Sequence, residues 1–148
     1  TGGTISMIRD TGTGALHPAD MQTFKTYVPE LFAGDITVDM IPFEPLLDSS
    51  DLNPNNWRQM AQIVQQHYDA YDGFVILHGT DTMAYSASAL SFMLDNLCKP
   101  VVFTGSQLPV GVLRSDAKEN ILTAIKIYLI QQEIVPLYTQ HLDFLFLQ

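Results

Sequence analysis

The sequence predicts a three-layer α/β fold with a mostly parallel sheet, on two observations. Continuous apolar runs occupy residues 74–77 and 101–103, and a short run of this kind is typical of a strand buried on both faces of a sheet. Each run is followed by a segment whose apolar residues recur at helical spacing. Strands and helices that alternate in this way form βαβ units, in which the strands are parallel and the helices cover the sheet.

Three helices are expected after residue 50. The first begins near Asn55, with Asn53 or Asn55 as its N-terminal cap. The second covers residues 83–97 and ends before a Lys-Pro pair. The third begins near Asp116, whose negative charge suits the first turn of a helix, and is expected to place Leu129 on its inner face.

The first third of the chain is less regular. Residues 1–14 contain four glycines, which predict a mobile loop without regular structure. Residues 18–32 are expected to form a short helix, and residues 36–43 alternate apolar and polar side chains as a strand does. Because a Gly-Gly turn of this kind normally follows a buried strand, we expect a strand before Thr1 that this sequence lacks.

Composition excludes several classes of function. The chain has 148 residues, which predicts one domain, and a formal net charge of −9 from 16 acidic and 7 basic residues. Such a surface repels phosphate backbones and offers no basic patch to anionic membranes, so neither nucleic acid nor membrane is an expected partner. The only cysteine, Cys98, is expected to be a small buried residue at the end of a helix. The four histidines show no metal-ligand spacing, so we expect no metal.

Three turns rich in glycine and threonine lie at the ends of expected strands, at residues 1–4, 79–82 and 104–107. In a parallel sheet, ligands bind beyond the carboxyl ends of the strands. The hydroxyl of Thr4 could then attack a substrate carbonyl if a neighbouring base accepts its proton. The alternative is a plain glycine turn that ends in a hydroxyl cap.

The other two polar segments allow two interpretations each. Thr80 or Asp81 could simply cap the next helix, or Thr80 could pass a proton while Asp81 holds a substrate ammonium group. We expect His78, at the end of a buried strand, to be packed and hydrogen-bonded and not to act as a base. The Asp-Ser-Ser stretch at residues 48–50 could form an ordinary Asx turn or recognise an α-amino and α-carboxylate pair.

The residues of these motifs and their order together resemble the L-asparaginases, in particular the bacterial cytoplasmic type I branch of the asparaginase/glutaminase family. The motifs that match are residues 1–5, 48–51, 72–85 and 104–107, and the resemblance extends from Thr1 to about Ile127. It implies that residues 1–148 form the Rossmann-like (flavodoxin-like) N-terminal catalytic domain, incomplete and without the family's C-terminal domain.

The resemblance also implies an activity, the hydrolysis of L-asparagine to L-aspartate and ammonia without a metal or cofactor. Thr4 would be the nucleophile that forms an acyl-enzyme, Thr80 would assist proton movement or water activation, and Asp81 would bind the α-amino group. The stretch that would hold the amino-acid head group consists of Asp48, Ser49 and Ser50. A cytoplasmic homodimer or homotetramer is implied for the full-length form.

The chain departs from the family pattern at several points. Ala15 or Leu16 stands where the family has a loop tyrosine, and Tyr27 is misplaced for that role. The family lysine in an Asn-Arg-Thr-Thr-Lys segment is absent, and Lys118 is expected to be a solvated helix residue and not its equivalent. From about Tyr128 the likeness fades, which suggests a premature end after a frameshift in the source gene.

Alternative functions remain open from the sequence. The rival enzymes are a related glutaminase and an amidotransferase subunit that takes ammonia from an amide for aminoacyl-tRNA. The side chains of asparagine and glutamine differ by one methylene, and pocket contacts discriminate one methylene by only about 1–3 kcal/mol. The rival from another class is a non-catalytic fragment. Low or no activity is expected for this chain, because loss of a general base typically costs ~10²–10⁴-fold in rate.

Overall fold

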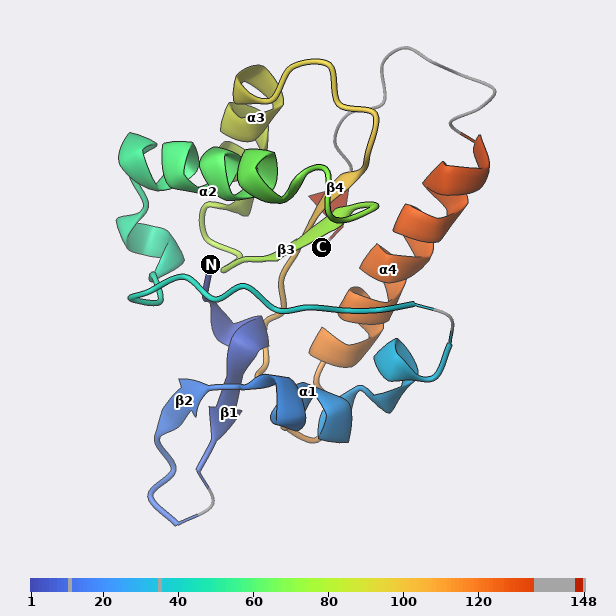
Figure 1. The fold of residues 1–148 in the computed structure, drawn as a ribbon. Coiled ribbons are helices and arrows are strands. Elements are labelled where there is room, and N and C mark those ends of the chain that lie inside the picture. Colours follow the sequence, from blue (N-terminus) through green and yellow to red (C-terminus); the bar gives the residue numbers. More distant parts are fainter. Residues whose placement is uncertain (11, 35, 135–145, 148) are drawn as a thin grey trace.

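The computed structural model describes residues 1–10, 12–34, 36–134 and 146–147 (Figure 1). Along the chain, short 3₁₀ turns and a hairpin come first, and helices then alternate with strands. The elements are η1 (Thr4–Ser6), β1 (Met7–Arg9), β2 (Leu16–Pro18), α1 (Met21–Tyr27), η2 (Pro29–Phe32), η3 (Ser49–Asp51), α2 (Pro54–His67), β3 (Phe74–Leu77), α3 (Met83–Met93), β4 (Val101–Thr104), α4 (Ala117–Ile134) and β5 (Phe146–Leu147).

The central sheet is parallel, as the sequence predicts. Its strand order is β3-β4-β5, with Phe74 opposite Val101 and Leu77 opposite Thr104. All four residues of β4 are buried, because β4 has a neighbour on each side and helices over both faces. A separate antiparallel hairpin, β1 and β2, stands outside this sheet.

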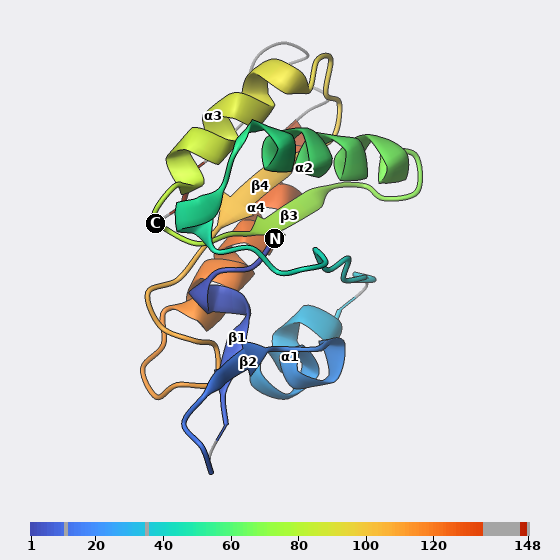
Figure 2. The same ribbon diagram turned by 90° about the vertical axis from the view of Figure 1, so that its left-hand side faces the viewer.

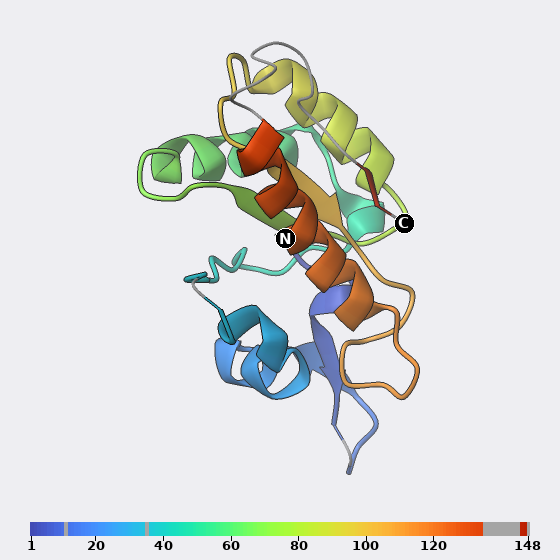
Figure 3. The ribbon, with the colours of Figure 1, turned by 90° about the vertical axis from the view of Figure 1, so that its right-hand side faces the viewer.

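Helices cover both faces of the sheet, so the three-layer prediction is confirmed. Helices α2 and α3 pack against each other on one face, and α4 crosses the other (Figures 1 and 3). Alternate strand residues point to the same face. Phe74 and Ile76 of β3 and Phe103 of β4 accordingly pack with Met60 and Leu90 of the two helices.

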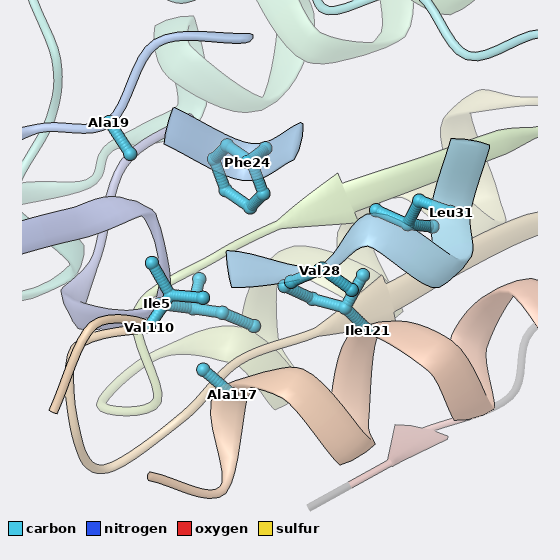
Figure 4. Packing of buried hydrophobic residues seen from close by; sticks show 8 residues of the cluster. All are labelled: Ile5, Ala19, Phe24, Val28, Leu31, Val110, Ala117 and Ile121. Carbon is cyan, nitrogen blue, oxygen red and sulfur yellow. The ribbon is translucent and has the colours of Figure 1, made fainter. Parts of the chain in front are cut away.

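A second apolar cluster fastens the N-terminal third to α4. Figure 4 shows Phe24 and Val28, from α1 and its C-terminal cap, directed towards Ile121 of α4 and towards Ile5. These four side chains are at most 3% exposed. The hairpin and α1 are therefore part of the packed domain and not an appendage.

Helix α2 begins as predicted, with Asn53 as its cap. The Asn53 side chain accepts a hydrogen bond from the N–H of Asn55, and the N–H of Asn53 donates to Asn56 Oδ1 at 2.9 Å. Pro54 occupies the first turn, where its missing N–H costs nothing. The start of α4 after Asp116 is also confirmed.

Three predictions for the N-terminal third are wrong. Residues 1–14 are not without regular structure, because η1 and β1 lie within them and β1 pairs with β2. The expected helix over residues 18–32 is split, because Val28 leaves the helical conformation before Pro29. The residues that the structure describes within 36–43 form no strand, since an alternating pattern needs a neighbouring strand for its ladder.

Four predictions for the second half also need correction. Helix α3 ends at Met93, not near Leu97, and Cys98 is exposed outside any helix. Leu129 is 42% exposed and not internal. Strand β3 is half-buried along its length and not fully buried as predicted. The expected loss of family likeness after about Tyr128 falls largely on residues 135–145 and 148, which lie outside the described residues.

Candidate active site

Three turns that are far apart in the sequence touch one another at the carboxyl end of β3. They are residues 1–4, 48–51 and 79–82. A Cβ atom on Gly3 would overlap the backbone of Gly79, and a Cβ atom on Gly79 would overlap the side chain of Ser49. Glycine is required at both positions by this close approach, and at Gly3 also by its φ of 80°. The contact brings together Thr4, which directly follows Gly3, and the turn that carries Thr80.

Asp81 is held by the loop that contains Ser49. The Ser49 hydroxyl donates to Asp81 Oδ2 at 2.9 Å, and the hydroxyl of Thr82 donates to the Ser49 carbonyl oxygen at 2.6 Å. Ser49 is only 4% exposed, whereas Asp81 lies at the surface. The carboxylate of Asp81 is therefore held by Ser49 at one oxygen and remains exposed to solvent. Such an arrangement can accept hydrogen bonds from a cationic group.

The expected capping of α3 by Thr80 or Asp81 is not found. The cap residue is Thr82, and no side-chain hydrogen bond caps the helix. The reason is visible in the contacts of the turn, because Asp81 and Thr82 are both engaged with Ser49. The first N–H groups of α3 are thus not covered by a capping side chain.

Asp48 forms the Asx turn that is one of its two sequence interpretations. Its Oδ1 accepts from both the N–H and the hydroxyl of Ser50, each at 2.9 Å. These hydrogen bonds lower the pKa of Asp48, so the carboxylate is negative at neutral pH. Asp48 and Ser50 are exposed beside buried Ser49. The turn therefore serves both to shape the loop and to present a negative charge.

Gln107 is a contact of Thr80 that sequence reasoning missed. Its side-chain amide donates to Thr80 Oγ1 at 3.4 Å. The Gln107 backbone is held in turn by Asp116 Oδ2, at 3.0 Å, and Asn120 binds the carbonyl oxygen of Gly105. The sequence signals were the place of residues 104–107 at the end of an expected strand and their match to a family motif. The turn at residues 104–107 is therefore a fourth segment at the site, next to Thr80.

His78 is packed and hydrogen-bonded, as expected. It is fully buried, with Nε2 2.9 Å from Ser86 Oγ and Nδ1 2.6 Å from the Gly79 carbonyl oxygen. The indole N–H of Trp57 donates to the same Ser86 oxygen at 3.0 Å. Burial lowers the pKa of His78, although its bond to Gly79 acts in the opposite direction. His78 therefore stabilises the turn at residues 79–82 by linking the Gly79 carbonyl oxygen to Ser86 of α3.

No lysine is identified as a base for Thr4 or Thr80 in the part of the chain that the structure describes. Lys118 is 2.7 Å from Glu30, Lys99 donates to the Tyr68 carbonyl oxygen, and Lys25 lies over Phe32. Lys118 is a partly exposed residue of α4, as expected, and its partner in the ion pair is Glu30. The ring of Tyr27 lies next to Gly111.

Apart from the glycines, the three turns carry hydroxyl and carboxylate side chains. The described residues contain no group of three or more His, Cys, Asp or Glu side chains placed to hold a metal ion. None of their helices is both long enough and apolar enough to cross a membrane. The turns offer hydroxyls, the hydrogen-bonded carboxylates of Asp48 and Asp81, and backbone N–H groups.

A family model described as "Asparaginase, N-terminal" matches residues 1–136. The chain belongs to the asparaginase family. Among curated relatives, L-asparaginase 1 of Escherichia coli K12 is 50% identical over 126 residues, which are 84% of this chain and 37% of that protein. A glutamyl-tRNA(Gln) amidotransferase subunit of Thermococcus kodakarensis is 43% identical over 129 residues, 85% of this chain and 29% of the relative.

Solved structures of the same family share the fold. L-asparaginase I of Vibrio cholerae matches with a TM-score of 0.74 and 46% identity, and the thermostable L-asparaginase of T. kodakarensis with 0.78 and 37%. Each match covers 86% of this chain and 38% of the other. The Rossmann-like N-terminal-domain prediction is thus confirmed. The chain spans 37–38% of the length of these asparaginases.

Proposed function

We propose that this chain supplies the nucleophile and the head-group contacts of an amidohydrolase that converts L-asparagine to L-aspartate and ammonia. The observation that carries the proposal is the meeting of the turns at Gly3, Ser49 and Gly79 at the carboxyl end of β3. That contact supports the proposal, because Thr4 follows Gly3 and Thr80 follows Gly79 along the chain. A single small amino acid can then touch all three segments.

Thr4 is the residue proposed to react. Its hydroxyl oxygen attacks the side-chain amide carbon, and the C–N bond breaks as ammonia leaves with the proton that the hydroxyl gives up. Water then attacks the ester carbonyl, releases aspartate and returns a proton to the Thr4 oxygen. Thr80, whose hydroxyl is held by Gln107, assists the proton movement. Backbone N–H groups of the turns stabilise the developing oxyanion.

The head group of the substrate is assigned to Asp81, Ser49, Asp48 and Ser50. The Asp81 carboxylate, fixed by Ser49, accepts hydrogen bonds from the α-ammonium group. Asp48 adds negative charge beside it, and its pKa lies below the ordinary value. The Ser50 hydroxyl can turn from Asp48 to the substrate carboxylate, since Ser50 is exposed.

The proposal includes a setting for the full-length form. We place it in the cytoplasm as a homodimer or homotetramer, on the resemblance to the type I branch. A solved relative from Campylobacter jejuni, at 28% identity and a TM-score of 0.69, carries the name "Probable Cytoplasmic L-asparaginase" and supports that branch. The amidotransferase relative keeps glutamine and aminoacyl-tRNA chemistry as the alternative to be tested.

The experiment is a graft, because the chain covers only part of its relatives. Residues 1–127 replace the matching region of E. coli L-asparaginase 1, and ammonia release is measured with asparagine and with glutamine. We expect activity on asparagine, and a loss of at least about 10³-fold in kcat for Thr4→Ala. Thr26→Ala, on the exposed face of α1, is the matched control and leaves kcat unchanged.

Two results would contradict the proposal, and a third would contradict the low activity expected for the chain alone. Turnover that survives Thr4→Ala removes Thr4 from the reaction. A graft that prefers glutamine moves the assignment to the alternative amidase. Substantial asparagine hydrolysis by the chain without the graft contradicts the expectation that a lysine base is needed.

A further inference from the structure

The connection from β4 to α4 is a wide loop whose two ends are tied together by side chains. In Figure 2 it leaves β4, runs downwards and returns to the first turn of α4. Asp116, at its far end, accepts the N–H groups of Gln107 and Leu108, one at each carboxylate oxygen, at 3.0 and 3.2 Å. Asn120, one turn further along α4, donates to Asp116 Oδ2 at 3.3 Å and to the Gly105 carbonyl oxygen at 2.9 Å. The backbone around Gln107 is therefore held from α4.

Asp116 suits this task because it is an anion with two acceptor oxygens. A carboxylate can accept two neighbouring N–H groups at once, whereas an amide side chain offers one oxygen and one N–H donor group. Burial acts to raise the pKa of Asp116, but the hydrogen bonds from Gln107 and Leu108 outweigh it and lower the pKa below its ordinary value. The carboxylate is consequently ionised at neutral pH, and both hydrogen bonds to the loop are charge-assisted.

The turn that Asp116 holds lies against Thr80 through two contacts. A Cβ atom on Gly105 would lie 3.2 Å from the methyl carbon of Thr80 and 2.7 Å from the His78 carbonyl oxygen, so the turn packs directly on the Thr80 side chain. The exposed Gln107 side chain donates from Nε2 to Thr80 Oγ1 at 3.4 Å. This length is close to the limit for an N–H donor, so a small displacement of the Gln107 backbone breaks the hydrogen bond.

The direction of this hydrogen bond decides what the Thr80 hydroxyl can do. A hydroxyl has one proton to donate and lone pairs with which to accept. Because Gln107 is the donor, Thr80 accepts from it, and the proton of Thr80 stays available to another partner. A hydroxyl in this state can give its proton to a leaving group or pass it to a base, which is the task assigned to Thr80.

We propose that Asp116 is a positioning residue for the reaction and acts on Thr80 through Gln107. It holds the backbone of residues 107–108 so that the Gln107 amide meets the Thr80 hydroxyl as a donor and leaves the Thr80 proton free to move. This role rests on the proposed function, since Thr80 is assigned its proton transfer there. The head-group contacts of Asp81 and Ser49 are separate from this tether, so loss of Asp116 should lower kcat and change KM little.

Kinetics in the graft test this role with a double-mutant cycle. Asp116→Asn keeps the shape of the side chain but turns an amide donor towards one of the two loop N–H groups. We expect its kcat on asparagine to fall about 10-fold with KM within about 2-fold, and the kcat of Gln107→Leu to fall about 10–100-fold. In the double variant Asp116→Asn should cost nothing further, because the amide through which it acts is already absent. Glu119→Gln, which removes an exposed carboxylate from the first turn of the same helix, is the matched control and leaves kcat unchanged.

A further variant tests the direction of the hydrogen bond. Gln107→Glu keeps the length of the side chain, but an ionised carboxylate can only accept, so the Thr80 hydroxyl must donate to it. We expect kcat to fall at least as far as it does for Gln107→Leu. A Gln107→Glu graft that keeps full activity overturns the proposal.

An NMR measurement on the full chain tests the tether independently of turnover. Nuclear Overhauser cross-peaks between the side-chain amide protons of Gln107 and the methyl group of Thr80 report the contact. We expect Asp116→Asn to remove these cross-peaks and Glu119→Gln to keep them. If Asp116→Asn does not fold, Asn120→Ala takes its place in both measurements, because it releases the same turn from α4.

The outcomes separate this role from the proposed function. Cross-peaks that survive Asp116→Asn overturn the proposal, and so does a fall in kcat of equal size with and without Gln107→Leu. Turnover that survives Thr4→Ala, together with cross-peaks that depend on Asp116, would refute the reaction assigned to Thr4 and support the tether. If the graft shows no turnover, the cross-peaks alone decide whether Asp116 positions Gln107.

Discussion

At the scale of single residues, the hydrogen bonds around His78 determine where its proton lies. The carbonyl oxygen of Gly79 can only accept, so Nδ1 carries the proton and donates to it. Nε2 must then accept from the Ser86 hydroxyl, whose oxygen in turn accepts from the Trp57 indole. The chain of donors is complete for neutral His78, and a second proton on Nε2 would break it.

A pH dependence of stability follows from the neutral state of His78. Its folded pKa is lowered by burial, so below about pH 6.5 the unfolded chain binds a proton that the folded chain rejects. We expect the free energy of unfolding to decrease as the pH is lowered through this window. His78 contributes up to about 1.4 kcal/mol per pH unit to this decrease. His78→Gln, which can still donate to Gly79 and accept from Ser86, should lack this contribution.

Urea denaturation of both proteins between pH 7.5 and pH 5 checks this expectation, because the other titrating groups cancel in the difference. The fluorescence emission of Trp57, the single tryptophan, is a second measurement of the same protonation. Protonation of His78 must turn the Ser86 hydroxyl away, so the emission of Trp57 should change at low pH in the unchanged chain alone. Parallel pH curves for the two proteins would show that His78 is not the group responsible.

At the scale of elements, the site depends on how closely its turns can approach one another. Gly79 is the tightest point, because it contacts both Gly3 and the side chain of Ser49. The backbones of the three turns approach closely because Gly3 and Gly79 carry no side chain, and the bridge between Gly2 and Leu47 adds a backbone contact. The position of Thr4 relative to Asp81 is therefore sensitive to one added methyl group.

Gly79→Ala tests this sensitivity. We expect a loss of about 1–3 kcal/mol in the free energy of unfolding, because the new methyl group must displace Ser49 or the Gly3 turn. In the graft, the KM for asparagine should rise as Ser49 releases Asp81. Gly34→Ala is the matched control, since a Cβ atom there meets nothing within 4 Å, and it should be neutral or mildly stabilising. Equal effects of the two substitutions would contradict the close-approach argument.

At the scale of the whole molecule, β4 is the element on which the described layers converge. It lies between β3 and β5 in the sheet, and both α3 and α4 contact it. Phe103, at 0% exposure, joins the cluster under α2 and α3 and also contacts the ring of His78 at 5.7 Å between centroids. The core under the helices and the support of the site turn thus share one side chain.

Phe103→Ala should therefore cost about 3–5 kcal/mol, through lost burial and the cavity left behind. Urea denaturation measures the loss, and Phe92→Ala on α3 is the control because its side chain is 91% exposed. The control should change stability by no more than about 0.5 kcal/mol. A small effect of Phe103→Ala would mean that the sheet does not depend on this packing.

The sequence alone determined the elements whose stability is local or whose pattern is unambiguous. The apolar runs of β3 and β4, the Asn53 cap of α2 and the start of α4 could each be identified from neighbours within a few residues. The asparaginase family was also recognisable, because its motifs follow one another in a fixed order. These signals depend on backbone conformation and burial, which short stretches of sequence encode.

Only the tertiary structure decided which segments meet. An alternating pattern at residues 36–43 predicted a strand, but a ladder needs a partner that the pattern cannot supply. The hold of Ser49 on Asp81 and the approach of Gln107 to Thr80 join residues 32 and 27 positions apart. Contacts of this range are fixed by the packing of helices on the sheet, and so the geometry of the candidate site lay beyond the sequence.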